Sequence, residues 1–409
     1  MFLWGVSLYG SHSLSVMEPH HMQHSDPVRE IVIVGAGLAG LIQAHALAAK
    51  GFSPHVVDPR SATALRQSNA DTRATALTPR SIELLGLPDA WLQTHGQRIS
   101  EMVVDGGLTT GLDPAKALHL DSGAWVVFNR DLVAFLLDGL DLQGTFGHAV
   151  VQSSRAGAHR VLHLDQQKSL RASLVIAADG KNSQLRRDED IQRHERDFRQ
   201  TALTGRIEHS QPHHGRAFQR FLPGGTLAFL PLAGAEQASS FIWVEPSAKA
   251  KGLFTLSADC LAGRMQARFG DTLGTLSARA DSDWGQFPLR AHHCNTIIGE
   301  RLALIGEAAH SMHPLAGQGL NMTIKDVDAL TAVLVDQRRH GLDLGDLQGL
   351  TVYQRDRRAE TARFTALTTG LHEVLDRGPA PVRALAATGL QLIDRLGPVK
   401  ALLRGEANR

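Results

Sequence analysis

The pattern of apolar residues is most regular near the start of the chain, where it predicts a strand, a turn, a helix and a second strand. Ile31–Val34 is a short, fully apolar run of β-branched residues, which is typical of a buried parallel strand. A glycine-rich turn begins at Gly35, and the Ala/Leu-rich segment Leu41–Lys50 has the composition of a helix. A second apolar run, Pro54–Val57, ends at Asp58. A dinucleotide-binding βαβ unit requires this order of elements.

The turn has the sequence Gly35-Ala36-Gly37-Leu38-Ala39-Gly40, and each glycine has its own steric role. Gly35 permits the tight turn, Gly37 lets a pyrophosphate approach the backbone, and Gly40 lets the helix pack on the strand. The helix N-terminus offers N–H groups and a partial positive charge. Asp58 is placed to accept hydrogen bonds from ribose hydroxyls and disfavours the 2′-phosphate of NADP. The fingerprint alone does not separate FAD from NAD, and a glycine-rich turn of an unrelated α/β protein is the alternative.

Two later segments also end apolar strands with glycine and acidic residues. Leu174–Ala178 precedes Asp179-Gly180. The carboxylate therefore stands at the carboxyl end of a strand, where open α/β sheets bind ligands, although a simple turn is the alternative. Arg301–Ile305 runs into Gly306-Glu307 and a glycine-rich stretch, followed by a helix expected over residues 320–334. Backbone N–H groups before that helix could form an anion nest for a reduced isoalloxazine ring; an ordinary loop is the alternative.

The middle of the chain is rich in strand signals. Arg216–Leu222 and Thr226–Leu232 are two runs that Pro223-Gly224-Gly225 joins as a hairpin, and Ser239–Val244 adds another strand. We expect an α/β fold in which a Rossmann-like cofactor domain carries an inserted, mostly antiparallel β-sheet substrate domain and a C-terminal helical segment. The predicted division is a tail (1–28), a discontinuous cofactor-binding domain (29–97, 124–199 and 295–337), a substrate domain (98–123 and 200–294) and C-terminal helices (338–409).

The composition limits the number of domains, the partners and the cellular compartment that fit this chain. The chain has 409 residues, 43% hydrophobic, and a formal net charge of +1. This length predicts two joined domains, and the balanced charge argues against a nucleic-acid partner. Cys260 and Cys294 cannot form a disulfide framework, lie in no metal-type cluster and suit a reduced, cytoplasmic compartment. No apolar run approaches membrane-spanning length. Met1–Leu14 is a poor signal peptide, so we interpret residues 1–28 as a flexible tail or a start assigned too early.

The three motifs together resemble those of the single-component flavoprotein aromatic hydroxylases. After the glycine fingerprint come Asp179-Gly180-x-x-Ser183-x-x-Arg186 and Gly306-Glu307-Ala308-Ala309-His310-x-x-His313-Pro314. Within that group, His313-Pro314-Leu315-Ala316-Gly317-Gln318-Gly319-Leu320-Asn321 is similar to the ubiquinone-biosynthesis hydroxylase family. The resemblance covers roughly Arg29 to Arg404. One departure is Glu307, where the family usually has Asp. Because Glu is one methylene longer, its contact to the ribityl chain must shift or pass through water.

The resemblance implies FAD as the cofactor and assigns roles around it. The glycines of the turn would cradle the pyrophosphate, Asp58 would hold the ribose, and Glu307 would face the ribityl hydroxyls. Asp179 would face the pyrophosphate region and also matter for the nicotinamide donor, and residues 314–321 would lie along the ring. The implied cofactor-binding residues are Gly35, Ala36, Gly37, Gly40, Asp58, Arg73, Arg130, Asp179, Glu307, Pro314, Gly317, Gly319, Leu320 and Asn321.

Some of these assignments have an alternative in which the residue is purely structural. Arg73 and Arg130 match arginines that lie near the cofactor in similar enzymes, with a surface ion pair as the alternative for each. For His310 and His313 we favour a hydrogen-bonding role in the loop over a proton shuttle, because the cofactor itself performs the oxygen chemistry. The sequence assigns no catalytic residue and no metal ligand.

The resemblance also implies an activity. NAD(P)H would dock transiently and reduce the flavin, and O₂ would then give a C4a-hydroperoxyflavin that hydroxylates an aromatic ring, here a polyprenylated phenol of ubiquinone biosynthesis. Two alternatives are a hydroxylase of another aromatic metabolite and a non-catalytic flavin-binding scaffold of a biosynthetic complex. Residues 380–403 have helical character, with basic residues nearby. Packing on the cofactor domain is the favoured role for this segment, and peripheral contact with the inner membrane or a partner protein is the alternative.

Overall fold

Apolar strands from distant parts of the chain meet in the first sheet. β1 (Arg29–Val34) pairs in parallel with β2 (His55–Asp58) on one side and with β11 (Ser169–Ala177) on the other. Ile31 and Ile33 have no exposed surface, because both faces of the sheet are covered at the last four positions of β1, which are all apolar. The other strands of this sheet are β8 (Gly144–Phe146), β9 (Val150–Ala156), β10 (His159–Leu164), β18 (Ile298–Gly299) and β19 (Leu302–Leu304).

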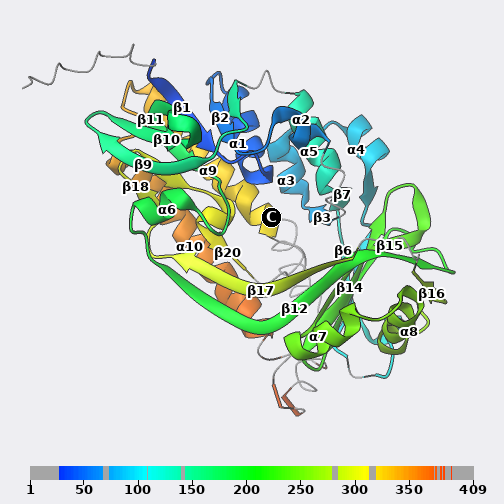
Figure 1. Cartoon of the computed structure of the whole chain (residues 1–409). Helices are drawn as coiled ribbons and strands as arrows, with labels where there is room; N and C mark the ends of the chain where they lie inside the picture. Colours follow the sequence, from blue (N-terminus) through cyan, green and yellow to red (C-terminus); the bar gives the residue numbers. More distant parts are fainter. Residues whose placement is uncertain are drawn as a thin grey trace, which may run out of the picture.

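Helices pack on this sheet and on one another (Figure 1). α1 (Leu38–Ala48) begins three residues earlier than predicted because Gly37 takes the N-cap position with an extended backbone. α9 (Gly319–Arg339) packs between α1 and α10 (Leu347–His372), and it is longer than the predicted helix over residues 320–334. The shorter helices are α2 (Ala62–Arg66), α3 (Pro79–Leu85), α4 (Asp89–His95), α5 (Asn129–Asp138) and α6 (Gln184–Asp188).

The second sheet is mostly antiparallel, as the sequence predicts. The predicted hairpin is present as β13 (Arg216–Leu222) and β14 (Gly225–Leu232). The strand predicted over Ser239–Val244 is longer and forms β15 (Ala235–Pro246). The remaining strands are β5 (Glu101–Asp105), β6 (Leu118–Asp121), β12 (Arg193–His209), β16 (Leu276–Ser277), β17 (Gly285–Cys294) and β20 (His310–Ser311), and α7 (Ser247–Phe254) and α8 (Ala258–Phe269) lie beside them.

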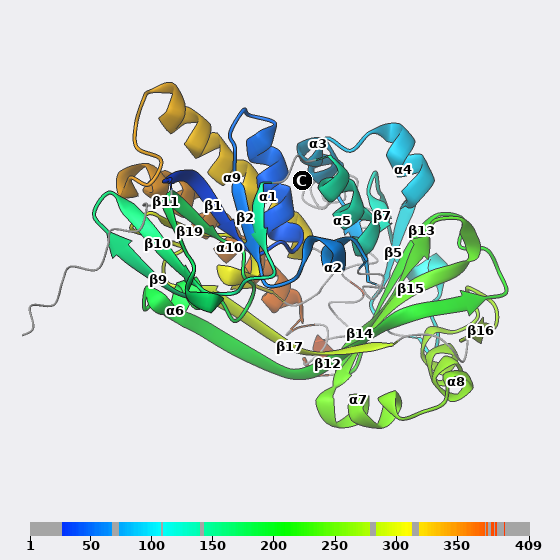
Figure 2. The same cartoon turned by 45° about the horizontal axis from the view of Figure 1, so that its top comes forward.

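The long strands β12 and β17 join the two parts of the molecule (Figure 2). They pair with each other from the side of α6 and α10 to the side of β14 and β15. β12 is a single strand across the predicted boundary at residue 199, although its pairing with β17 shifts register between Asp197 and Thr201. The domain limits therefore stay a prediction, although β5 and β6, from the predicted segment 98–123, do lie in the second sheet. A small third sheet contains β3 (Ala74–Leu77), β4 (Gly96–Arg98) and β7 (Trp125–Phe128).

The computed structural model describes residues 27–67, 73–107, 109–139, 143–278, 284–312 and 319–372, with a few isolated positions after residue 372. Within these ranges the fold class is the predicted one, a Rossmann-like sheet joined to an antiparallel sheet. The expected tail, the loop around Pro314 and Gly317, and nearly all of the helical segment expected over residues 380–403 lie outside the described residues. Short 3₁₀ turns are found at Pro114–Lys116, Asp165–Gln167 and Gly306–Ala308.

Candidate functional site

The glycine turn between β1 and α1 is closed by backbone contacts. Gly35 has a φ of +105°, and a Cβ there would lie 2.4 Å from the carbonyl oxygen of Ala178. A Cβ on Gly40 would lie 1.8 Å from the carbonyl oxygen of Gly35, so α1 approaches the turn this closely only with glycine at that position. Gly37 differs, because a Cβ there would meet no atom within 4 Å. The turn therefore leaves the backbone at Gly37 open to an approaching phosphate.

Asp58, at the end of β2, is engaged by groups of its own chain. Its Oδ2 accepts a hydrogen bond of 2.6 Å from the Ala36 N–H, and the Arg60 guanidinium binds both carboxylate oxygens at 2.9 and 3.0 Å. Burial alone would raise the pKa of Asp58, but the hydrogen bonds from Arg60 and Ala36 lower it. Arg60, which the sequence reasoning missed, stands at the cavity in front of Asp58. Ribose binding by this carboxylate therefore requires Arg60 to share it or to move.

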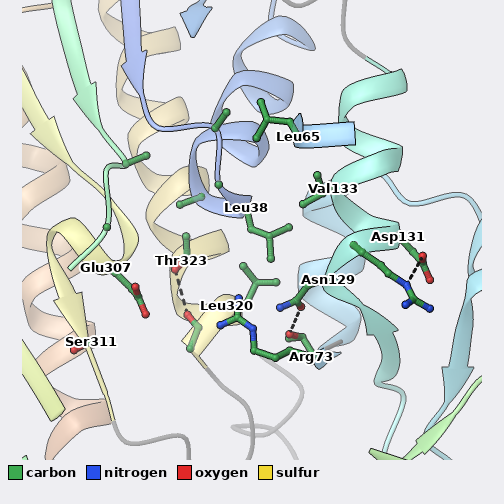
Figure 3. A pocket seen from close by; sticks show the side chains of 18 of the residues that line it. Leu38, Leu65, Arg73, Asn129, Asp131, Val133, Glu307, Ser311, Leu320 and Thr323 are labelled. Carbon is green, nitrogen blue, oxygen red and sulfur yellow. Dashed lines mark hydrogen bonds and ion pairs between the residues drawn. The ribbon is translucent and has the colours of Figure 1, made fainter. Parts of the chain in front are cut away.

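A cavity of about 530 Å³ lies at the N-terminal turns of α1 and α9 (Figure 3). Gly37 and Leu38 border it from α1, and Gly319 and Leu320 border it from α9. Two helix N-termini that face one cavity add their partial positive charges there. Four arginine side chains that line the cavity add full charges: Arg60, Arg66, Arg73 and Arg130. The sequence analysis singled out the last two. The electrostatics of the cavity therefore suit an anionic ligand such as a pyrophosphate.

The two predicted arginines make different contacts at the cavity. The Arg73 guanidinium lies 5.6 Å from the ring centroid of Phe287, which belongs to the second sheet. Arg130 lies over Phe128 at 4.7 Å and pairs with Asp131 at 3.5 Å. Both arginines line the cavity, and contact between either of them and FAD stays a prediction.

Asp179 follows β11 and lies between Ala178 and Gly180, which border the cavity. Its Oδ2 accepts the Gln184 N–H at 2.8 Å. The Oδ1 atom is buried and has no hydrogen-bond partner among the described residues. Burial raises the pKa of this carboxyl group. A buried acceptor without a partner is costly in a folded protein, and a hydroxyl donor of a bound cofactor would satisfy it.

Glu307 lies in the 3₁₀ turn after β19, and its exposed side chain borders both this cavity and a second one. Figure 3 shows Glu307 on one side of the cavity and Asn129 on the opposite side, with Leu320 and Arg73 between them. Asn129 is held there by the Thr75 hydroxyl, which donates to its side-chain oxygen at 2.7 Å. Glu307 is thus in the region that the ribityl chain and ring would occupy, and direct contact stays a prediction.

The residues predicted along the isoalloxazine ring have three different outcomes. Gly319 and Leu320 line both cavities. The Asn321 side chain is buried and committed elsewhere: its amide donates to the Ala76 carbonyl at 2.9 Å, and its oxygen accepts from the Ser81 hydroxyl at 2.7 Å. Asn321 therefore ties α9 to β3 and α3 and does not line either cavity. Pro314, Gly317 and His313 lie outside the described residues.

The second cavity, about 700 Å³, lies against the antiparallel sheet and shares part of its wall with the first. Residues common to both include Arg73, Glu307, Leu320 and Ser311. Its remaining wall carries the charged residues Lys181, Arg193, Glu195 and Arg290. The other residues are mainly apolar with two hydroxyl groups, and small-molecule sites commonly combine apolar surface with a few polar groups. These residues come from β12, β15 and β17 and include Ala202, Thr204, Ser240, Ile242, Phe287 and Leu289.

His292 also borders the second cavity. Burial, together with the nearby Arg186 and Arg193 cations, lowers its pKa to about 4, so the imidazole is neutral near pH 7. The Nε2 atom lies 3.0 Å from the Glu307 carbonyl oxygen. That oxygen can only accept, so Nε2 carries the proton, and Nδ1 accepts from the Ser311 hydroxyl at 2.7 Å. His292 therefore positions the Glu307 turn and has no proton to release easily.

His310 makes a hydrogen bond of the kind that the sequence analysis expected, and the choice between this role and a proton shuttle stays a prediction. Its Nε2 lies 2.7 Å from Oδ2 of the buried Asp326 on α9. Arg357 of α10 reaches the other oxygen of the same carboxylate at 2.7 Å. Sequence reasoning gave Asp326 and Arg357 no role at the site. Asp326 lies in the helix expected over residues 320–334, but nothing in the sequence indicates that Arg357, 31 residues later, contacts it.

Comparison with known proteins agrees with this geometry. The profile of the FAD-binding domain family matches residues 29–368. The chain belongs to this family. It is 34% identical over 391 residues to the ubiquinone hydroxylase UbiL of Rhodospirillum rubrum, an alignment that covers 94% of this chain and 90% of that one. It is 30% identical to the 3-demethoxyubiquinol 3-hydroxylase of Escherichia coli, over 91% of this chain and 96% of the other.

Solved structures share the fold. The p-nitrophenol 4-monooxygenase PnpA of Pseudomonas putida superposes with a TM-score of 0.75 over 93% of this chain and 98% of that chain, at 18% identity. A variant of Klebsiella pneumoniae HpxO, whose structure contains FAD, has a TM-score of 0.71 over 91% of this chain and 97% of that chain, at 17% identity. With the family shown by sequence, the chain is an FAD-dependent monooxygenase, and the predicted cofactor is confirmed. The open backbone at Gly37, the arginines and the unpartnered Asp179 oxygen fit that cofactor.

Proposed function

We propose that this enzyme hydroxylates the aromatic ring of a polyprenylated ubiquinone precursor, using O₂ and a transiently bound NAD(P)H. The observation that carries the proposal is the wall shared by the two cavities, which includes Glu307 and Leu320. With FAD in the first cavity, a ring in the second would lie beside the flavin. The substrate class is supported by the activities named for the two relatives.

FAD, when bound, supplies the redox and oxygen chemistry, and the protein has to bind the ring, orient it and exclude water. Ile242, Leu289 and Phe287 offer apolar surface that would displace water from the reacting atoms. The hydroxyl groups of Thr204 and Ser240 lie on the same wall and would hydrogen-bond to oxygen substituents of the ring. The first cavity, with its arginines and helix N-termini, would fix the pyrophosphate and so determine where the flavin lies.

The proposal is tested with the purified flavoprotein and a set of prenylated phenols that differ at the ring positions. We expect NAD(P)H oxidation to be stimulated by one of them, and the product mass to rise by one oxygen atom that derives from labelled O₂. A matched phenol without the prenyl tail serves as the control for substrate class. NAD(P)H oxidation that yields only peroxide with every prenylated phenol would refute the proposal. Complementation of hydroxylase-deficient strains then identifies the ring carbon.

As the alternative to packing on the cofactor domain, we further propose a second role for the C-terminal segment, residues 380–403, which would bring the enzyme to the membrane surface where a prenylated substrate resides. The support is its basic sequence, which includes Arg383, Arg395 and Lys400. Among the described helices, none is long and apolar enough to cross a membrane. Co-sedimentation with anionic vesicles should decrease when the chain is truncated after Pro379. Unchanged co-sedimentation of the truncated enzyme would contradict this proposal.

A further inference from the structure

The turn that carries Glu307 is held in place by hydrogen bonds to its backbone atoms. The Glu307 side chain borders the cofactor cavity. Gly306 has a φ of +56°, which favours glycine. From the side of the second sheet, the His292 ring donates to the Glu307 carbonyl at 3.0 Å. Arg186 donates to the Ala308 carbonyl at 2.9 Å. These contacts fix the middle of the turn from one direction.

The two ends of the turn are held by a single carboxylate oxygen. Oδ2 of Asp326 accepts the Gly306 N–H at 3.0 Å and also binds His310 Nε2 at 2.7 Å. Asp326 is fully buried in α9, the helix whose N-terminal residues border both cavities. Glu307 lies between the two contacts, so a shift of the carboxylate would displace the segment that presents its side chain.

The carboxylate is itself held in place by α10. Arg357 Nε donates to Oδ1 at 2.7 Å, and Arg357 also pairs with Glu360, which in turn binds Lys325 of α9 at 2.6 Å. A buried carboxylate without a partner would be strongly destabilising. Burial alone would raise the pKa of Asp326, but the His310 and Arg357 interactions lower it, which keeps the group charged. An anionic acceptor can bind all three donors at once, whereas a neutral amide cannot.

We propose that Asp326 is a positioning residue for FAD, which acts by holding both ends of the Gly306–His310 turn so that Glu307 meets the cofactor. Arg357 fixes the carboxylate and acts one step further away. The inference depends on FAD binding and on the proposed contact between Glu307 and FAD. It does not depend on which substrate is hydroxylated.

The test is a double-mutant cycle read out as FAD affinity. Apoprotein is titrated with FAD, and quenching of flavin fluorescence is followed for the wild type, D326N, E307A and the double variant. We expect D326N and E307A each to weaken binding by about tenfold, as is common when a supporting contact is removed. Because Asp326 acts through Glu307, D326N should change affinity by less than about twofold in the E307A background.

Two further variants keep the test decisive. D328N serves as the matched control, because Asp328 lies on the same helix, is half exposed and pairs only loosely with Arg80 at 3.5 Å. Its FAD affinity should stay within about twofold of the wild type. H310F removes the hydrogen bond between His310 and Asp326 and leaves the Asp326–Arg357 pair in place. If D326N does not fold, H310F replaces it in the double-mutant cycle with E307A.

The outcomes separate this inference from the proposed function. Additive losses in the cycle would mean that Asp326 supports the fold without acting through Glu307, and the inference would be wrong. Wild-type FAD affinity in E307A would overturn it as well. Neither result bears on the proposed ring hydroxylation, which is measured in a separate assay. A wild-type protein that binds FAD but forms no hydroxylated product would refute the proposed function and leave the cycle interpretable.

Discussion

Replacement by alanine should affect stability differently at two glycines of the same turn, because a Cβ on Gly37 would meet no protein atom and a Cβ on Gly40 would meet the backbone. In G40A the new Cβ would lie 1.8 Å from the Gly35 carbonyl oxygen. Main-chain atoms cannot rotate away as a side chain does, so α1 must move from β1. Such overpacking costs about 1–3 kcal/mol or more. The gain of roughly 1 kcal/mol in helix propensity from replacing glycine does not offset it.

In G37A the new Cβ meets no protein atom within 4 Å, and the backbone at this N-cap already has a φ of −75° that alanine adopts. The expected loss is the preference for glycine over alanine at an N-cap, about 0.5–1 kcal/mol. FAD affinity should nevertheless fall by at least about tenfold, equivalent to roughly 1.4 kcal/mol, because the methyl group would occupy the space predicted for the pyrophosphate.

Both variants are measured in the same two assays. Thermal unfolding of the apoprotein gives stability, and titration with FAD gives affinity. G37A should unfold close to the wild type and bind FAD poorly, whereas G40A should lose both properties. Wild-type FAD affinity in G37A would refute the placement of the pyrophosphate at this turn. Unchanged apoprotein stability in G40A would refute the steric argument.

Three other substitutions test separate parts of the site and the fold. Replacing Glu307 by Asp should preserve or tighten FAD binding, and a complete loss of flavin on purification would contradict the placement of this residue. I242F should fill part of the second cavity and raise the KM for the aromatic substrate several-fold while FAD affinity, measured by titration, stays the same. Burial raises the pKa of Glu245, partly offset by Arg268 at 3.6 Å, and Oε2 has no partner among the described residues. An acid with a raised folded-state pKa destabilises the protein as pH rises above its unfolded value near 4.3. E245Q should therefore stabilise the protein by about 1 kcal/mol at pH 7 and have little effect near pH 4, and an equal shift of the unfolding temperature at both pH values would show that ionisation is not the cause.

The sequence by itself determined the features that depend on neighbouring residues. The Gly35–Gly40 turn, the apolar β1 and the hairpin of β13 and β14 are all local patterns, so periodicity and turn chemistry predicted them. The resemblance of short motifs then gave the family and FAD. Helix limits were less well predicted, because a cap such as Gly37 starts a helix before the composition alone indicates it.

Only the tertiary structure decided which side chains are available to the cofactor. Asp58 is paired with Arg60, and the Asn321 amide is used by β3 and α3, although both residues were predicted to face FAD. Conversely, Asp326 and Arg357 meet beneath the Glu307 turn. The physical reason is that a sequence pattern indicates which residues are buried, whereas the packing of α9 against α10 and against the turn after β19 determines which donor meets which acceptor.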